Sequence, residues 1–478
     1  MKPGDVFARD EEWAELERHA TIGEARLGIV TGRRRVGKTY LLRRLSEQFG
    51  GLFHTCLQEE RLPSLRHFSD SLGAFHGIQL GTPVDWSAAI SQATRGPLAV
   101  PVLIIDEFPY LLEHSPELES VLQHAIDASR ENRGTRIILA GSSLAVMGGL
   151  LDGQRPLRGR ADLQLRLEPF NFRTAAAFWG VASPSVAFRL HAVLGGSPGY
   201  RALVPDFPPD RASFDGWIER TLLNPASALY HEDDYLLAED RRVGDRAVYA
   251  SILRAVAAGE HRPSRIAGRI GRPQTSLSHL FGVLGGAGFL HNDAGMLSAK
   301  DPLYRLSDEI IQFTRACVDP WRDLIEEQRR PDAWRFAQPT WKAGVLGPHL
   351  ERIARVWVHR FASPDLLGGT PGLVGRAEIP DPVAKVSREV DLIVLEPGSR
   401  PGADAQVLCL GEVKLHADID AIGQLDRAAD LIAARGHGRA SRLLLIAESF
   451  SPGVVQIAGA RPDLQLVSLN DLYGQSAR

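Results

Sequence analysis

The sequence predicts an α/β protein built from several domains, and three observations carry this prediction. Short, nearly continuous apolar runs alternate with amphipathic helical stretches over residues 1–160. The same alternation returns from about residue 335, after a middle part that is mainly helical. Apolar strands separated by helices are typical of a parallel sheet covered on both faces. The chain has 478 residues, enough for three or four domains of ordinary size.

The composition is that of an ordinary globular protein. Hydrophobic residues make up 44% and charged residues 24% of the chain, which excludes wholesale disorder. The 55 basic and 58 acidic residues give a net charge of −3, which excludes a generally polybasic binder but not a local basic patch. The three cysteines lie far apart and predict neither a disulfide framework nor a zinc site. With no secretory signal and no apolar run near ~20 residues, we expect a cytoplasmic protein without a membrane partner.

A glycine-rich loop follows the first expected strand, residues 26–32, and precedes an expected amphipathic helix, residues 38–49. Its sequence GRRRVGKT, residues 32–39, matches the pattern G-x-x-x-x-G-K-S/T in full. Such a loop curls its backbone N–H groups around a phosphate, and the helix N-terminus adds a partial positive charge. The alternative, a surface turn, does not require a strand before the loop and a helix after it. The motif therefore predicts a nucleotide site, with ATP and Mg²⁺ as the expected cofactors.

Residues of the loop have distinct expected roles. Lys38 should reach the β- and γ-phosphates, which makes it a candidate catalytic residue, and Thr39 should bind Mg²⁺. The residues expected to contact ATP in and beside this loop are Gly32, Arg35, Val36, Gly37, Lys38, Thr39 and Tyr40.

The ends of two further expected strands supply polar side chains. The strand at 98–106 ends in Asp106, expected to hold Mg²⁺, and is followed by Glu107, the expected general base for the attacking water. The strand at 135–143 carries Ser142 near its end, where a hydroxyl could orient that water. The alternative for Ser142 is an ordinary strand-to-helix turn.

Six short segments occur in an order that resembles a known family: FARDEE (7–12), GRRRVGKT, LIIDEF (103–108), LAGSS (139–143), PLRGRA (156–161) and GGSPGY (195–200). The order resembles the archaeal-type ATPase family of the AAA+/STAND-related P-loop class. The resemblance implies that Arg160 is an arginine finger or γ-phosphate sensor and that Pro198 lies near the base and sugar. The alternatives are a surface arginine in a glycine turn and a helix-capping turn. A homo-oligomer is expected if Arg160 acts on a neighbouring copy.

Residues 261–292 have the spacing of a winged helix-turn-helix. A short helix ends at Gly271, Pro273 opens a second helix, and strand-like residues follow. The segment contains four arginines and no acid, which favours contact with DNA phosphates. The polar residues that could face a groove are Gln274, Thr275, Ser276 and Ser278. The alternative is that this segment packs on the nucleotide domain and reports its state without binding DNA.

A second chemical motif lies in the last part of the chain. Asp391 begins the core of one expected strand, and Glu412 and Lys414 lie two residues apart on the next, so both face one side. Two carboxylates and a lysine can hold Mg²⁺ and stabilise a charged transition state. This spacing resembles the PD-(D/E)XK, restriction-endonuclease-like fold, in which Glu351 on the preceding helix is a further candidate metal ligand and Lys414 is catalytic. The alternative is a solvated ion pair between Glu412 and Lys414.

Together these observations predict four parts, in this order: a P-loop ATPase core (1–164), a helical lid (165–240), a winged-helix domain (241–325) and a nuclease-like α/β domain (335–478). A linker rich in charge, proline and tryptophan is expected at 326–341. The expected function is an ATPase coupled through the winged helix to a DNA-directed, Mg²⁺-dependent nuclease. One alternative is an ATP-driven switch or DNA-binding adaptor with an inactive nuclease fold, and another is an ATPase that remodels protein partners.

Overall fold

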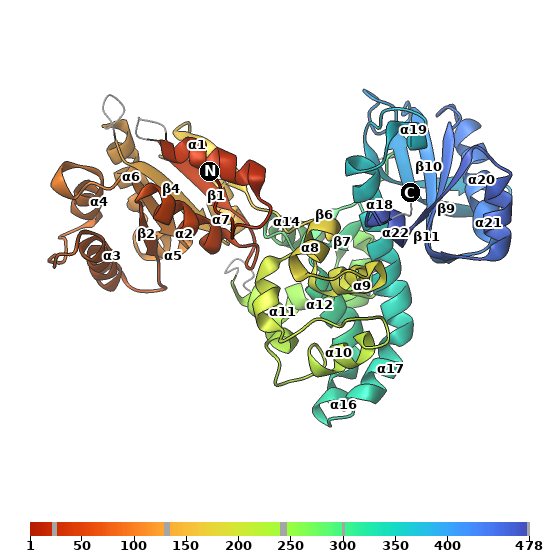
Figure 1. The fold of residues 1–478 in the computed structure, drawn as a ribbon, viewed down its shortest axis with the longest axis horizontal. Coiled ribbons are helices and arrows are strands. Elements are labelled where there is room, and N and C mark those ends of the chain that lie inside the picture. Colours follow the sequence, from red (N-terminus) through yellow and green to blue (C-terminus); the bar gives the residue numbers. More distant parts are fainter. Residues whose placement is uncertain (22–25, 129–133, 240–245, 299–301, 476–478) are drawn as a thin grey trace. The chain divides into compact units, whose positions relative to one another are not determined.

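The computed structural model describes residues 1–21, 26–128, 134–239, 246–298 and 302–475 (Figure 1). The chain divides into two compact units. The first unit comprises Met1–Phe170 with Ser197–Tyr200 and Gly286–Gly288. The second comprises Asn171–Gly196, Arg201–Gly285 and Phe289–Arg478. In the part of the chain that the structure describes, no helix is long and apolar enough to cross a membrane.

The first unit is built on a parallel sheet, as the alternation of apolar runs and helices predicted. Its strands, in the order β2-β3-β4-β1-β5, pair in parallel throughout. The strands are β1 (Leu27–Thr31), β2 (Leu52–Thr55), β3 (Val102–Asp106), β4 (Arg136–Gly141) and β5 (Ala161–Arg166). The strand expected at 98–106 is shorter than expected, because a 3₁₀ turn, η1 (Gly96–Leu98), and Pro101 precede β3. Pro101 lacks the N–H that a central strand needs for pairing.

Helices cover both faces of this sheet. On one face, Ile29 and Ile105 pack with side chains of α3, α4 and α6; on the other, Val30 and Ile104 pack with α1 and α2. Adjacent residues of a strand point to opposite faces, so both faces of each central strand must be apolar. The helices of this unit are α1 (Asp10–Thr21), α2 (Lys38–Phe49), α3 (Arg61–His76), α4 (Trp86–Thr94), α5 (Pro109–His114), α6 (Leu118–Asp127) and α7 (Leu144–Gly149).

The middle of the chain is helical, as expected. Its α-helices are α8 (Phe172–Trp179), α9 (Pro184–Leu194), α10 (Phe214–Arg220), α11 (Glu232–Glu239), α12 (Arg246–Ala257), α13 (Pro263–Ile270), α14 (Ser278–Gly286), α15 (Glu309–Phe313), α16 (Arg322–Glu326), α17 (Arg330–Thr340) and α18 (Gly347–Arg360). Tighter or wider turns connect them: η2 (Pro198–Leu203), η3 (Ala228–His231), η4 (Gln274–Ser276), η5 (Thr314–Val318), η6 (Asp319–Trp321) and η7 (Trp341–Leu346). Helix α13 ends where expected, at Gly271 in the left-handed conformation.

Two short strands after α14 form a hairpin, and residues between them pack against the C-terminal sheet. β6 (Leu290–Asn292) pairs antiparallel with β7 (Tyr304–Leu306). Between them, the N–H of Met296 donates to the carbonyl of Arg376 at 2.8 Å. The side chains of Met296 and Leu297 pack on the hydrophobic core of the C-terminal sheet. Residues of this hairpin segment therefore cover part of the hydrophobic core of that sheet.

The linker expected at 326–341 was a wrong prediction, because the segment is mostly helical. Pro331 sits in the first turn of α17, where the missing N–H costs nothing. Trp334 and Trp341 are buried and pack against Phe313. The large apolar area of these rings favours a packed helix over an exposed linker.

The C-terminal sheet has the order β12-β11-β10-β9-β8. Its first three strands in the chain pair antiparallel, and β10, β11 and β12 pair in parallel. Side chains of α20 pack on the sheet's hydrophobic core. The strands are β8 (Val374–Asp381), β9 (Val386–Leu395), β10 (Val407–Ala417), β11 (Arg442–Phe450) and β12 (Leu464–Ser468). The accompanying helices are α19 (Pro364–Leu367), α20 (Ile419–Ala433), α21 (Pro452–Gly459) and α22 (Leu469–Leu472).

A buried carboxylate closes the hairpin between β8 and β9. Asp381 Oδ1 accepts hydrogen bonds from the N–H groups of Val383 and Ala384. Its side chain also pairs with Arg388 and with Arg427 of α20, each at 2.8 Å. The hydrogen bonds from Arg427 and Arg388 hold the pKa of Asp381 below its ordinary value of 3.8.

We predict that Asp381→Asn lowers the stability of the protein most at neutral pH. A carboxyl group whose pKa is lowered by folding stabilises the folded state above its unfolded pKa, and this contribution disappears as the pH falls below about 4. The difference in melting temperature between wild type and variant should therefore be largest at pH 7 and shrink toward pH 3. A difference that is the same at every pH would contradict this role.

Candidate functional site

The glycine-rich loop lies between the end of β1 and the start of α2, as its motif predicted. Gly32 has φ +157°, and a Cβ there would lie 2.6 Å from the carbonyl oxygen of Leu167. Gly37 has φ +94°, in the left-handed region directly before α2. Both positions therefore favour glycine for reasons of backbone conformation or space.

Lys38 and Thr39 begin α2 and face the sheet. The ammonium of Lys38 donates to the carbonyl oxygens of Gly32 at 2.6 Å and Arg33 at 3.1 Å. Burial lowers the pKa of Lys38, and the nearby carboxylates Glu107 and Asp106 oppose this shift. The hydroxyl of Thr39 donates to Asp106 Oδ2 at 2.7 Å. Two of the predicted groups, the loop hydroxyl and the strand-end carboxylate, are thus in contact.

Glu107 and Ser142 also meet at this edge of the sheet. Glu107 Oε2 accepts hydrogen bonds from the N–H of Ser142 at 3.2 Å and from its hydroxyl at 3.0 Å. Glu107 has φ +54°, an uncommon conformation for a residue with a side chain. Strained backbone of this kind tends to occur at functional sites. The carboxylate is therefore held in a defined position by the neighbouring strand end.

The segment that contains Pro198 lies directly on the loop. The N–H of Gly199 donates to the carbonyl of Arg35 at 2.9 Å, and a Cβ on Gly37 would lie 3.6 Å from Pro198 Cγ. The guanidinium of Arg35 lies 5.7 Å from the ring centre of Tyr200, a cation–π contact. Pro198 is therefore beside the loop, and its place near the base and sugar of the nucleotide stays a prediction.

Two arginines and one tyrosine remain among the side chains that lie near the loop or were expected there. Arg9, which the sequence reasoning did not count among the site residues, precedes α1 and donates to the carbonyl of Val36 in the loop at 3.2 Å. Its only sequence signal is the motif FARDEE. Tyr40 is exposed, and its hydroxyl donates to Asp5 at 2.9 Å. Arg160 pairs with Asp127 at 2.7 Å, and no hydrogen bond among the described residues joins it to the loop.

A second centre lies on β9 and β10 of the C-terminal sheet. Lys414 Nζ lies 2.6 Å from Glu412 Oε1 and 4.0 Å from Asp391 Oδ2. The N–H of Val413 donates to Asp391 Oδ2 at 3.0 Å, which fixes that carboxylate against β10. The three residues predicted from their spacing are therefore together on one side of the strand pair.

Glu351, on α18, belongs to the same centre electrostatically. Burial and the charge of Asp391 raise the pKa values of both Glu351 and Glu412 to about 7. Burial also raises the pKa of Asp391, against the effect of Lys414. A divalent cation stabilises crowded, buried carboxylates because it neutralises their charge, so this side-chain set fits Mg²⁺.

Comparisons with known proteins find a family match in the N-terminal part of the chain. Residues 6–183 match the family described as "ATPase domain predominantly from Archaea". The uncharacterized protein MJECL04 of Methanocaldococcus jannaschii is 25% identical over 323 residues, 67% of this chain and 70% of that protein. The Walker-type ATPase paby2304 of Pyrococcus abyssi matches 65% of this chain and 96% of its own, with 20% identity and a TM-score of 0.48. The ORC2 protein of Aeropyrum pernix matches 69% of this chain and 96% of its own, with 14% identity and a TM-score of 0.45.

The family match and the loop geometry together define a class of protein. Residues 6–183 carry a P-loop ATPase domain, and the protein is an ATPase. The family match ends before residues 261–292 and before the centre on β9 and β10.

We predict that Lys38→Ala removes nucleotide binding. The substitution deletes the one ammonium that the loop places for the β- and γ-phosphates. Isothermal titration with ATP should detect no binding at concentrations that saturate the wild type, with an unchanged melting temperature as the control for folding.

We predict that Glu107→Gln binds ATP but hydrolyses it about 10² to 10⁴ times more slowly, the usual contribution of a general base. The amide can still accept the hydrogen bonds from Ser142 but cannot take a proton. Phosphate release under saturating ATP measures the rate, and Glu117→Gln, at an exposed carboxylate paired with Arg61, is the control. Normal turnover by Glu107→Gln would show that another group is the base.

Proposed function

We propose that this protein is an ATPase that controls a DNA-directed, Mg²⁺-dependent nuclease in its C-terminal domain, through a winged-helix segment. The observation that carries the nuclease part is the convergence of Asp391, Glu412 and Lys414 on one side of two strands. The ATPase part rests on the loop, its partner carboxylates and the family match of residues 6–183.

In the ATPase site, Thr39 and Asp106 would hold Mg²⁺, which neutralises phosphate charge when bound. Their contact at 2.7 Å brings a hydroxyl and a carboxylate oxygen to one point, a donor set that Mg²⁺ accepts. Glu107 would take the proton of the attacking water, and Ser142 holds that carboxylate in place. Pro198 would lie against the nucleotide. Arg160 would need to leave Asp127 before it could act on the γ-phosphate, within the chain or on a neighbouring copy.

DNA is the partner favoured by the helix-turn-helix. Arg265, Arg269 and Arg272 are exposed on or directly after α13, and the polar residues 274–276 that follow are exposed as well. Exposed guanidinium groups beside polar side chains suit a phosphate backbone and base edges. Arg262, the fourth arginine of this segment, pairs with Glu378 of β8 at 2.6 Å, and Arg269 lies 3.9 Å from Glu260. The hairpin of β6 and β7 is held by β8, so DNA contact would come from the helices.

In the nuclease-like centre, Asp391, Glu412 and Glu351 would hold Mg²⁺, which activates water and shields the phosphate. Lys414 would stabilise the charge that develops on the phosphate in the transition state. Burial alone would lower the pKa of Lys414. The charges of Glu412 and Asp391 outweigh burial and raise the pKa overall, so the ammonium keeps its proton at neutral pH.

The alternative is an ATP-driven switch or DNA-binding adaptor whose nuclease-like fold is inactive. Its support is the contact of 2.6 Å between Lys414 and Glu412, which is equally typical of a structural ion pair. A cleavage assay separates the two functions.

We predict that the wild-type protein cleaves plasmid or short DNA with Mg²⁺ or Mn²⁺ and that Lys414→Ala loses this activity. Loss of the ammonium should slow cleavage at least about 100-fold, because a preorganised charge aimed at the transition state contributes several kcal/mol. Lys385→Ala, at an exposed turn of the same sheet, is the matched control. Comparing reactions with and without ATP tells whether the first domain controls cleavage.

Absence of cleavage under every condition would favour the switch. A salt series of DNA binding then tests the remaining contact. DNA affinity that comes from phosphate contacts must fall steeply as the salt concentration rises. If the surface recognises a protein partner, no such salt-dependent DNA binding is expected.

A further inference from the structure

The second unit contains a cavity of about 570 Å³. Its walls come from the end of α12, the β6–β7 hairpin, α15, η7, α18 and the start of β8. Apolar side chains, among them Val256, Val345 and Val356, line part of it. The volume lies within the range of small-ligand sites, and polar side chains converge on it from several elements.

The residues that line the cavity include three arginines and two carboxylates, and Arg305 also pairs with Glu389 at 3.4 Å. Arg305 of β7 and Arg352 and Arg355 of α18 face two carboxylates, Asp293 and Glu309. Asp293 is shared, because its Oδ2 lies 2.8 Å from Arg305 Nε and 3.9 Å from Arg355 Nη2. The second of these distances is too long for a hydrogen bond.

The histidines of the wall do not add charge at neutral pH. Burial lowers the pKa of His261 below its ordinary value, and burial beside Arg352 lowers that of His349 well below it. Neutral imidazoles offer flat, polar edges and faces without competing for an anion.

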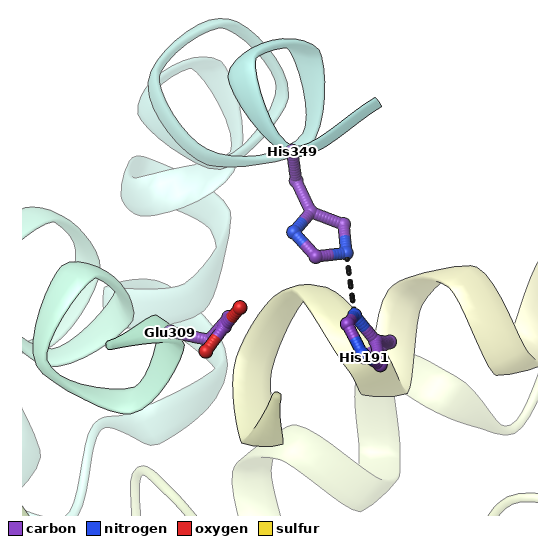
Figure 2. A group of neighbouring side chains, drawn as sticks. All are labelled: His191, Glu309 and His349. Carbon is purple, nitrogen blue, oxygen red and sulfur yellow. Dashed lines mark hydrogen bonds between the residues drawn. The ribbon is translucent and has the colours of Figure 1, made fainter. Parts of the chain in front are cut away.

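One corner of the wall has the residue types of a metal site. His191, Glu309 and His349 place their ligand atoms within 4.8 Å of one another (Figure 2). However, Arg352 donates to His349 Nδ1 at 2.7 Å, and an arginine only donates. The proton of His349 is therefore on Nε2, which bonds to His191 Nδ1 at 3.0 Å (Figure 2). Both lone pairs that a cation would use are engaged, and Arg352 also pairs with Glu309 at 2.8 Å.

We infer that this cavity binds a phosphate group carried by a nucleotide, either a free mononucleotide or the phosphorylated end of a nucleic acid strand. Guanidinium groups match the oxygens of a phosphate with two parallel hydrogen bonds, and the apolar wall suits a base or sugar. Arg355 also donates to the carbonyl of Asp391 at 2.9 Å, so the cavity adjoins the carboxylate centre. The inference concerns binding and does not require that this centre cleaves.

The test uses the full chain carrying Lys38→Ala, so that the ATP site takes no nucleotide, in buffer with EDTA, so that no metal supports cleavage. The probes are thymidine 5′-monophosphate and one short labelled oligonucleotide with either a 5′-phosphate or a 5′-hydroxyl. We expect the mononucleotide to bind, the phosphorylated strand to bind at least about 10-fold tighter than the hydroxyl form, or both. Which probe binds identifies the source of the phosphate.

Arg352→Gln should abolish this preference, and Arg352→Lys, which keeps the charge but loses the planar fork, should weaken it while preserving the fold. Arg360→Gln is the matched control on the exposed end of the same helix. Equal affinity for the two strands with no binding of the mononucleotide would overturn the inference. So would a phosphate preference that survives Arg352→Gln in a folded protein, or one bound Zn²⁺ that is lost in His191→Ala and excludes the phosphate.

Discussion

The hydrogen bond between Thr39 and Asp106 joins residues that are 67 positions apart, and the first unit is arranged so that this bond can form. Thr39 stands at the start of α2, and Asp106 is the last residue of β3. The strand order places β4 between β1 and β3, so the carboxyl ends of three neighbouring strands meet at one edge of the sheet. The open crevice at such an edge is where α/β sheets bind ligands. Ser142 follows β4 and holds Glu107, so each of the three strand ends contributes one part of the site.

In the second unit, side chains of like charge lie close together. Asp391, Glu412 and Glu351 are drawn together although the charge of Asp391 raises the pKa of both glutamates, an arrangement that costs folding free energy without a compensating cation. Lys414 and Arg355 offset part of this cost. Residues with perturbed pKa values of this kind concentrate at functional sites, which is a physical reason to treat the centre as more than a surface ion pair.

Much of this could be predicted from the sequence because local patterns determine it. Apolar runs and period-two alternation predicted three strands of the first sheet, β1, β3 and β4, and the pair of strands that carries Asp391 and Glu412, but not β2 or β5. The segment 326–341 could not be read this way. Its prolines and charges are typical of a linker, but the burial of Trp334 and Trp341 depends on side chains far away in the chain. For the same reason the sequence did not predict the contacts of Arg9 with Val36 and of Arg305 with Asp293, because no local pattern encodes a partner beyond a few turns of the chain.

The hairpin of β6 and β7 has a consequence for where the C-terminal domain begins. Met296 and Leu297 pack on the core of a sheet whose first strand starts only at Val374. A fragment cut at residue 335 would therefore carry a bare apolar surface on β8 and would lose Arg305, Asp293 and the main-chain bond to Arg376. The C-terminal domain therefore includes residues that lie far before its first strand in the sequence. The smallest autonomous piece that contains the carboxylate centre must therefore also contain the hairpin.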